Sequence, residues 1–346
     1  MKIVRVPAVA IVSLAMLSSC SFSGAPAVRS GAQPAAIGSV KHMGGVPPSI
    51  IYVANFGGSD ILGFPLNSRG HVVPIVDLSG PNTRIGFPQS VGVDSAANQY
   101  TMLKTSGTGR THVGVFTVGA TGNVAPTRVF TDAIASHHGR ILAADPTGTV
   151  YLLYSDEHQH FGIDVFGAGA TGVVMPSREI AGRKTLMDKQ ETIVSLFADD
   201  AGAVWWACDG EVGVSRVVGY APGANGNVAP AVVLPADSIT QIVSPTFAGV
   251  DTPGNVYVNS TGSNPSVLVF APGATGDVAP IRSMQLPVNY HVTTVYEEAL
   301  IADGTVGLGN PAIAVFDANG SGPQQPLRVI SGAKTKLNQP AGVAIN

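Results

Sequence analysis

Cysteine, charge and long hydrophobic runs are all scarce in this chain, and each shortage excludes a class of protein. Only two cysteines occur in 346 residues, and charged residues make up 12% of the chain. The formal net charge of −3 gives no electrostatic basis for binding nucleic acid. Amphipathic helices with charged faces are therefore few. The abundant residues are 42 glycines and 25 prolines, with many Val, Thr and Asn, which is typical of an all-β chain rich in turns.

The N-terminus has the three parts of a secretory signal. Lys2 and Arg5 are basic, residues 3–17 are mostly apolar, and small residues follow. The apolar run is too short to span a membrane, which takes about twenty residues. Residues 1–19 are therefore predicted to be a signal peptide.

The end of that signal resembles a bacterial lipobox. The sequence Leu-Ser-Ser-Cys ends at Cys20, and the resemblance implies that Cys20 is lipidated and becomes the mature N-terminus. An ordinary signal with a chance cysteine is the alternative. Ser21 stands where an aspartate would favour inner-membrane retention. We therefore expect an exported lipoprotein anchored through lipid alone, in the outer membrane if the source has one.

Two domains follow from this assignment. Residues 20–46 are rich in Ser, Gly, Ala and Pro and are predicted to be a lipidated, flexible tether. Residues 47–346 form the folded part. Once Cys20 is lipidated, Cys208 has no cysteine partner for a disulfide. It lies in a strand-like run, and we expect a buried, inert thiol.

One stretch repeats along the folded part. GATGDVAP at residues 273–280 returns as GATGNVAP at 119–126, GATGVVMP at 169–176 and GANGNVAP at 223–230. Worn copies end at Pro74 and Pro326. A period near fifty residues marks a repeat architecture. We expect these loops to supply turn glycines, since no Lys-Ser/Thr follows them as in a phosphate-binding loop.

Each repeat contains four short apolar segments with the composition of β-strands. In one unit they are residues 247–251, 255–259, 267–270 and 281–284, here called a to d. Four strands in about fifty residues is the β-propeller unit. The first unit lacks strand a, whereas residues 340–346 form a strand a with nothing after it. The prediction is a six-bladed propeller closed by the C-terminal strand, without a free sheet edge.

The combined pattern resembles the NHL-type six-bladed propellers of bacteria. Its elements are a G-V-A-x-D strand, a G-N-V-Y-V strand, a V-x-V-F strand and a P-x-R-x-I strand, with P-x-G-V-A at the closure. The resemblance covers residues 49–346. It implies the architecture and leaves the activity open, because the family is functionally broad.

Most repeated polar residues have structural interpretations. The aspartates that end strand a are expected to cap the next turn through their own backbone. We assign this role to Asp94, Asp145, Asp200, Asp251 and Asp303. The arginines that begin strand d are expected to protect a sheet edge, the alternative being a ring of ligand-binding groups. These are Arg128, Arg178, Arg282 and Arg328.

The histidines point to one face. The d–a and b–c loops share a face, which usually carries the binding site in the propellers that this chain resembles. Six of the eight histidines lie in those loops, and four fall on the third blade together with Asp156 and Glu157. Imidazole and carboxylate suit Zn, Cu, Ni or Fe. The candidate ligands for a divalent metal are His137, His138, Asp156, His158 and His160. Solvated loop histidines are the alternative.

Two functions remain open from the sequence. The first is a lipid-anchored, monomeric envelope platform that binds a protein, peptide or glycan through variable loops. The second is a propeller enzyme, lactonase-like or lyase-like. The lactonase resemblance implies a metal-binding Glu in the first blade, but residues 51–80 contain no Glu. HExxH and GxSxG motifs are also absent. A lyase would use His138 or His291.

Overall fold

The structure is a computed structural model that describes residues 49–104, 110–187, 192–210, 215–261, 265–287, 290–306 and 309–346. The predicted signal peptide, Cys20 and the tether lie outside the described residues. Contacts divide the chain at residues 46 and 47, so the described residues all belong to the predicted folded domain. Helix in this part is limited to single 3-10 turns, none of which could cross a membrane.

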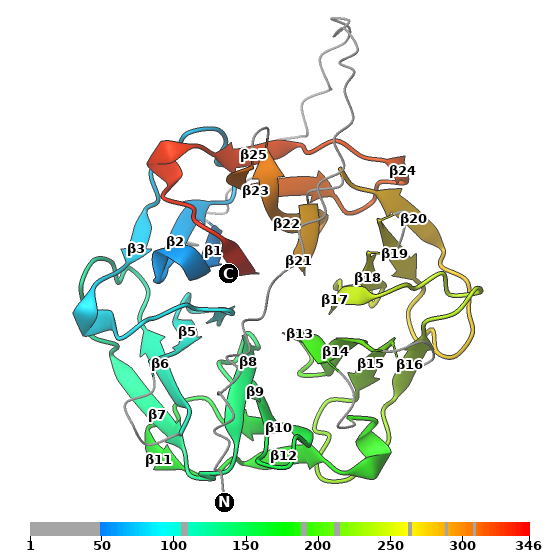
Figure 1. The fold of residues 1–346 in the computed structure, drawn as a ribbon, viewed down its shortest axis with the longest axis horizontal. Helices are drawn as coiled ribbons and strands as arrows, with labels where there is room; N and C mark the ends of the chain where they lie inside the picture. The colour runs from blue at the N-terminus through cyan, green and yellow to red at the C-terminus, as the bar shows by residue number, and fades with distance from the viewer. Residues whose placement is uncertain are drawn as a thin grey trace, which may run out of the picture. The chain divides into compact units, whose positions relative to one another are not determined.

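Six small sheets form a ring of blades, so the predicted six-bladed β-propeller is confirmed (Figure 1). Strands a to d of each blade are antiparallel neighbours and run from the centre outward. Blade 1 holds β26 (Pro340–Ile345), β1 (Ile50–Asn55), β2 (Asp60–Pro65) and β3 (Val76–Leu78). Blade 2 holds β4 (Gly92–Val93), β5 (Gln99–Met102), β6 (His112–Phe116) and β7 (Arg128–Asp132). Blade 3 holds β8 (His138–Ala144), β9 (Val150–Ser155), β10 (Phe161–Phe166) and β12 (Arg178–Ala181).

The other three blades repeat the arrangement. Blade 4 holds β13 (Thr192–Ala198), β14 (Val204–Asp209), β15 (Arg216–Tyr220) and β16 (Val232–Pro235). Blade 5 holds β17 (Pro245–Val250), β18 (Val256–Ser260), β19 (Ser266–Phe270) and β20 (Arg282–Gln285). Blade 6 holds β21 (Tyr290–Tyr296), β22 (Ala299–Val306), β23 (Asn310–Asp317) and β25 (Arg328–Ser331).

The C-terminal strand closes the ring as predicted. β26 pairs antiparallel with β1, with Ile345 opposite Ile51 and Val343 opposite Val53. The fully buried side chain of Asn55 adds a lock, because its Nδ2 donates to the carbonyl oxygen of Lys336 and its Oδ1 accepts from the main-chain N–H of Asn338. Both ends of the described chain are therefore held in one blade.

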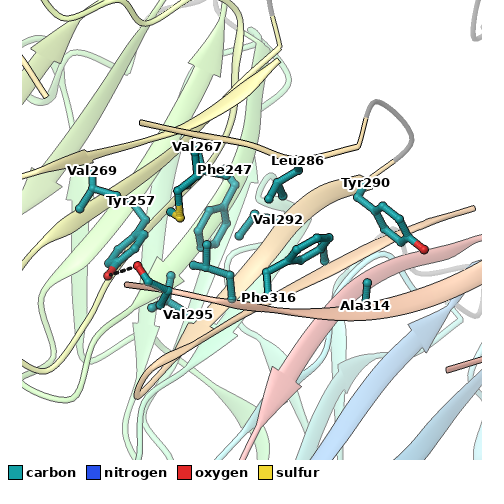
Figure 2. Packing of buried hydrophobic residues seen from close by; sticks show 14 of the residues in the cluster. Phe247, Tyr257, Val267, Val269, Leu286, Tyr290, Val292, Val295, Ala314 and Phe316 are labelled. Carbon is teal, nitrogen blue, oxygen red and sulfur yellow. Dashed lines mark hydrogen bonds between the residues drawn. The ribbon is translucent and has the colours of Figure 1, made fainter. Parts of the chain in front are cut away.

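The hydrophobic core consists of six clusters, one between each pair of neighbouring blades in the described part. Figure 2 shows the cluster between blades 5 and 6, where Phe247 and Tyr257 of one blade pack toward Val292 and Phe316 of the other. Alternate side chains of each strand face opposite neighbours. Every blade thus buries both faces, which is why its strands are apolar at nearly every position.

The repeated GATG stretch has a role beyond turning the chain. Its second glycine lies beside strand d of the preceding blade, as when the N–H of Gly276 donates to the carbonyl of Val233 at 2.7 Å. In two copies this contact extends into short parallel strands, β11 (Gly172–Val174) beside β7 and β24 (Gly322–Pro323) beside β20. Gly70 joins blade 1 to Val329 of blade 6 in the same way. The loops are clasps that cover the outer edge of each neighbouring blade.

Two arginines of strand d support these clasps. At their positions the expected role, protection of a sheet edge, is therefore replaced by contacts between blades. The guanidinium of Arg128 donates to the carbonyl of Ala170, and that of Arg178 donates to the carbonyl of Ala224, both at 2.9 Å. Each acceptor belongs to the next blade's clasp. These side chains are half-buried connections between blades.

The turn aspartates are confirmed in three positions and corrected in two. Asp94 Oδ1 accepts from the N–H groups of Ala96 and Asn98, and Asp145 and Asp251 cap their turns likewise. In blade 4 the capping residue is Asp199, one position before the predicted Asp200. In blade 6 Asp303 lies within strand b, because strand a is β21 and precedes the segment assigned to it.

Candidate functional site at the third blade

The d–a and b–c loops of blade 3 meet at one end of the blade, as predicted. His138 at the start of β8 is paired with Ser155 at the end of β9, and Ser155 is paired with Phe161 at the start of β10. Residues 133–137 and 156–160 therefore emerge on the same face. His112 and His291, at or near the starts of β6 and β21, lie at the corresponding ends of blades 2 and 6.

Asp156 organises the β9–β10 turn. Its Oδ1 accepts from the main-chain N–H groups of His158 and His160, each at 2.8 Å, and its Oδ2 lies 2.9 Å from His160 Nδ1. Desolvation is the largest single effect and would raise the pKa of Asp156, but the hydrogen bonds from His160 and His158 together outweigh it and lower the pKa to about 2. The His158 and His160 rings lie edge to face, 6.0 Å apart. The structure brings these three predicted residues together in an exposed turn.

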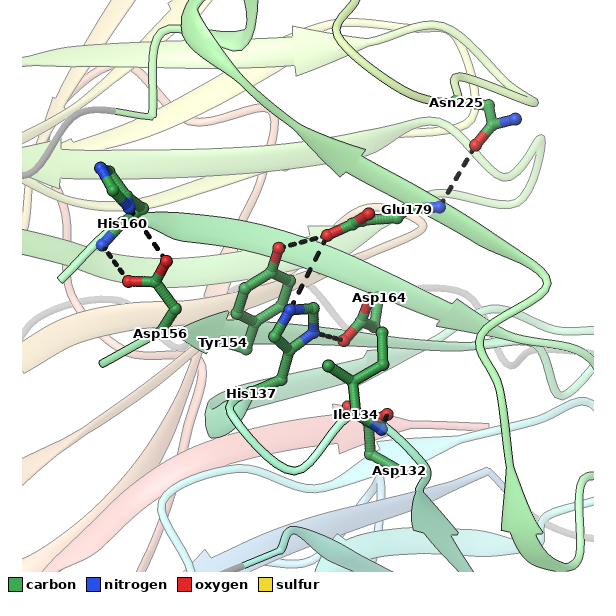
Figure 3. A network of polar contacts seen from close by, with 9 residues as sticks. All are labelled: Asp132, Ile134, His137, Tyr154, Asp156, His160, Asp164, Glu179 and Asn225. Atoms are coloured by element: carbon green, nitrogen blue, oxygen red, sulfur yellow. Dashed lines mark hydrogen bonds and ion pairs between the residues drawn. The ribbon is translucent and has the colours of Figure 1, made fainter. Parts of the chain in front are cut away.

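His137 lies in a different, buried group of residues. Its Nδ1 is 2.6 Å from Asp164 Oδ2 on β10, and its ring stacks on the Tyr154 ring at 3.5 Å with an interplanar angle of 7° (Figure 3). His137 is 8% exposed and Asp164 is fully buried. His138, the next residue, begins β8 and is half-buried. The five predicted ligands are thus not one cluster.

A glycine makes room for the Tyr154 ring. Gly162 on β10 lies beneath it, where an added Cβ would overlap the phenol. The ring can therefore cross strand c, and its hydroxyl donates to Glu179 Oε1 on β12 at 2.5 Å. Glu179 Oε1 is also 3.9 Å from His137 Nε2. The two ring nitrogens of His137 consequently face different carboxylates.

Asp132 completes the group from the neighbouring blade. It ends β7 in blade 2, is 1% exposed, and accepts the N–H of Ile134 with Oδ1 at 2.9 Å. Its ligand atoms lie within 4.8 Å of those of His137 and Asp164. Asp132 Oδ2 and Asp164 Oδ1 are buried without a hydrogen-bond partner. We name Asp132, His137 and Asp164 the blade 2/3 cluster.

The electrostatics of this cluster follow from burial. Burial and then the nearby Asp164 raise the pKa of Asp132 to about 7, although the Ile134 N–H opposes the shift. Burial lowers the pKa of His137, but the hydrogen bond to Asp164 and the charges of Asp164, Asp132 and Glu179 outweigh it, so the net pKa is raised. The cluster favours bound protons or another positive charge.

The sequence interpretation missed Asp132, Asp164, Glu179 and Tyr154. The sequence did contain a signal for Asp164. Phe-Gly-Ile-Asp-Val-Phe at residues 161–166 places an acid in the middle of a strand that is otherwise apolar, and a buried acid in such a strand needs a partner. Comparing loops alone could not reveal it, since Asp164 lies on a strand.

The axis of the propeller contains a cavity of about 980 Å³ lined by the strands a. Its described lining includes no His, Cys, Lys or Arg. Three of the four aspartates that line it, Asp94, Asp199 and Asp251, cap the a–b turns. Of the His, Asp, Glu and Asn side chains that the enzyme alternative would bring together at the axis, the described lining supplies carboxylates and Asn346 but no imidazole.

Comparison with known proteins finds no family and only remote structural likenesses. No family model matches the sequence, and no curated protein matches it significantly. Among solved structures, a Lactobacillus plantarum protein is similar with a TM-score of 0.47 and 10% identity, over 86% of this chain and 99% of that one. The WD40 domain of Toxoplasma gondii coronin has a TM-score of 0.45 and 11% identity over 78% of this chain.

Hydrazine synthase of Kuenenia stuttgartiensis is similar with a TM-score of 0.46 and 11% identity, over 78% of this chain and 73% of that one. The chain spans 63% of the coronin chain, less than two-thirds of its length. Likenesses this remote carry no argument about function.

Proposed function

We propose that this chain is a lipid-anchored cell-envelope propeller of the NHL type, whose d–a/b–c face binds a protein partner. The observation that carries the proposal is the exposed aromatic Phe87, with further apolar side chains, on loops that differ between blades. The c–d loops carry more exposed apolar side chains, Val173 and Met175 among them, but these belong to the repeated clasps. Phe87, Ile239 and Val243, from two d–a loops, are 61%, 50% and 50% exposed. A rigid ring that presents variable loops with apolar side chains is suited to protein recognition.

The backbone at Phe87 adds to this argument. Its φ is +50°, in the left-handed region that bulky residues rarely adopt. Its ring lies 5.4 Å from that of Phe56, which comes from the b–c turn of blade 1. An unfavourable conformation that holds a phenylalanine in solvent is typical of a functional position. The pair offers an aromatic anchor of the kind that dominates protein interfaces.

The partner face can be tested by photo-crosslinking in the native envelope. A benzophenone-bearing amino acid replaces Phe87 in one variant and Val243 in a second. A third variant carries it at Val124, an exposed residue of a c–d loop on the opposite face. We expect the same protein adduct from Phe87 and Val243 and none from Val124. Adducts of equal yield on both faces, adducts to glycan alone, or no adduct would overturn the proposed partner.

The anchor can be tested independently. Replacing Cys20 with Ser removes the thiol that the lipobox reaction would acylate, so the protein should lose its fatty-acid label and its partitioning into detergent. A substitution of Ser19 by Ala is the control, since small residues are accepted before the cysteine in the resembled motif. Unchanged labelling of the Cys20→Ser variant would contradict the lipoprotein assignment.

A further inference from the structure

The blade 2/3 cluster departs from the internal repeat at its two acids. Asp164 is paired with Glu179 on strand d, and the matching position of strand c is apolar in every other blade. These residues are Leu62, Gly114, Val218, Leu268 and Ala314. Asp132 stands two residues after the buried Phe130. The matching residue is Gly80, Gly182 or Gly332 in three blades and Ala236 or Leu286 in the other two.

The d–a loop that begins at Asp132 also departs from the repeat. In three blades the d–a loop begins with a Gly-x-x-Thr turn in which the threonine hydroxyl donates to the glycine carbonyl, as Thr185 does to Gly182 at 2.6 Å. Residues 132–135 are Asp-Ala-Ile-Ala and lack both partners. The other blades therefore fold without an equivalent of this cluster. Folding of the scaffold does not require it, so the cluster serves another purpose.

Charge is unbalanced within the cluster. Three carboxylates, those of Asp132, Asp164 and Glu179, surround the single imidazole of His137. No Lys or Arg in the described part of the chain forms an ion pair with Asp132 or Asp164. The buried oxygens Asp132 Oδ2 and Asp164 Oδ1 have no hydrogen-bond donor other than a proton shared between the two carboxyl groups. Buried charges of one sign are costly unless protons or a cation balance them.

We propose that Asp132, His137 and Asp164 bind one divalent transition-metal ion between blades 2 and 3. Their ligand atoms, all within 4.8 Å of one another, can converge on one ion with small side-chain movements. The imidazole nitrogen favours zinc, manganese or iron over calcium and magnesium, which prefer oxygen alone. The ion joins two blades and does not depend on the partner face.

The surroundings of His137 fit a ligand role. Nδ1 lies 2.6 Å from Asp164 Oδ2, whereas Nε2 lies 3.9 Å from Glu179 Oε1. A metal-bound histidine commonly directs its second nitrogen at a carboxylate, which fixes the tautomer and the ring orientation. Tyr154 stacks on the ring and holds Glu179 through its hydroxyl. Glu179 and Tyr154 are thus positioning residues.

The proposal is tested by calorimetric titration of the full chain, purified in detergent and stripped with a chelator, with zinc and manganese in turn. We expect one equivalent of at least one of these metals to bind with a Kd of the order of 1 µM or tighter. Asp164→Asn and Asp132→Asn should each remove this binding. Glu179→Gln should weaken it about 10- to 100-fold by loosening His137.

The exposed turn supplies the matched control. The double variant His158→Ala, His160→Ala removes both imidazoles of the third blade's b–c loop and should bind the metal like the wild type. A circular dichroism melt of each apo variant shows whether it is folded. Asp164→Leu, the residue found in blades 1 and 5, is the second variant if Asp164→Asn does not fold.

Two outcomes would overturn the proposal. The first is wild-type protein that binds neither metal more tightly than about 1 mM, which would leave a proton as the balancing charge. The second is tight binding that persists in folded Asp132→Asn and Asp164→Asn variants but disappears in the His158, His160 double variant. That result would place the ion in the exposed turn.

Discussion

Gly162 shows how a single missing methyl group positions the polar group at blade 3. The Tyr154 ring occupies the space that a Cβ would take and thereby reaches Glu179 two strands away. Gly162→Ala should destabilise the protein by about 1–3 kcal/mol, because overpacking displaces the ring from His137. Gly167→Ala is the matched control, since nothing lies within 4 Å of an added Cβ there. Equal melting temperatures for the two variants would refute this role.

Asp60 gives the blade 1 lock a pH dependence. Burial first, and to a smaller extent Asp77, raise its pKa to about 6, against the hydrogen bond from Asn55. An unfolded aspartate loses its proton near 3.8. Between these values the folded chain binds more protons than the unfolded chain, so this contribution to stability is present at low pH and is lost as pH rises toward 6.

Asp60→Asn removes the stability loss that occurs as pH rises, while it keeps an oxygen that can accept a hydrogen bond from Asn55. At pH 7 the variant should be more stable than the wild type by about 1–3 kcal/mol, and below pH 4 the two should be equal. Urea unfolding at pH 4 and pH 7 measures the difference. A stability difference that does not change with pH would contradict the assignment to Asp60.

At the scale of the element, the strands were predictable because their patterns repeat. Apolar and β-branched runs separated by glycine and proline gave the four strands of most blades, and repetition compensated for weak single signals. Blade 6 was misassigned because Leu300–Asp303 imitates a strand a that ends in aspartate, whereas the true β21 contains polar residues such as His291 and Thr293.

The roles of the loops were less predictable, because they depend on contacts between blades. GATG glycines signal a turn locally, but their hydrogen bonds to the preceding strand d join residues more than forty positions apart, as with Gly276 and Val233. The blade 2/3 cluster was hard to predict for the same reason, because Asp132 and Asp164 belong to different blades. The histidines of residues 137–160 directed attention to blade 3, which also supplies His137 and Asp164 to the blade 2/3 cluster, while finding the buried acids required the strand register.

At the scale of the whole molecule, stability depends on β26. Deleting residues 340–346 removes the innermost strand of blade 1 and exposes the β1 edge together with apolar side chains such as Ile51 and Val53. We expect aggregation or failure to fold, assayed by size-exclusion chromatography and thermal melting. Asn346→Ala, which loses only the bond to the Ile50 N–H, is the mild control. A truncated protein that melts cooperatively at the wild-type temperature would refute the closure.

The pairing of β1 with β26 also sets an order of events during synthesis. Strand β1, the first in the described part of the chain, is paired with one that begins nearly three hundred residues later, whereas the other strands of each blade pair within one repeat. Blades 2 to 5 can therefore assemble while translation continues, but blade 1 remains three-stranded until residue 345 is made. During that interval the nascent chain carries an unpaired β edge that can aggregate. A chaperone that shields β1 would protect the chain in this period.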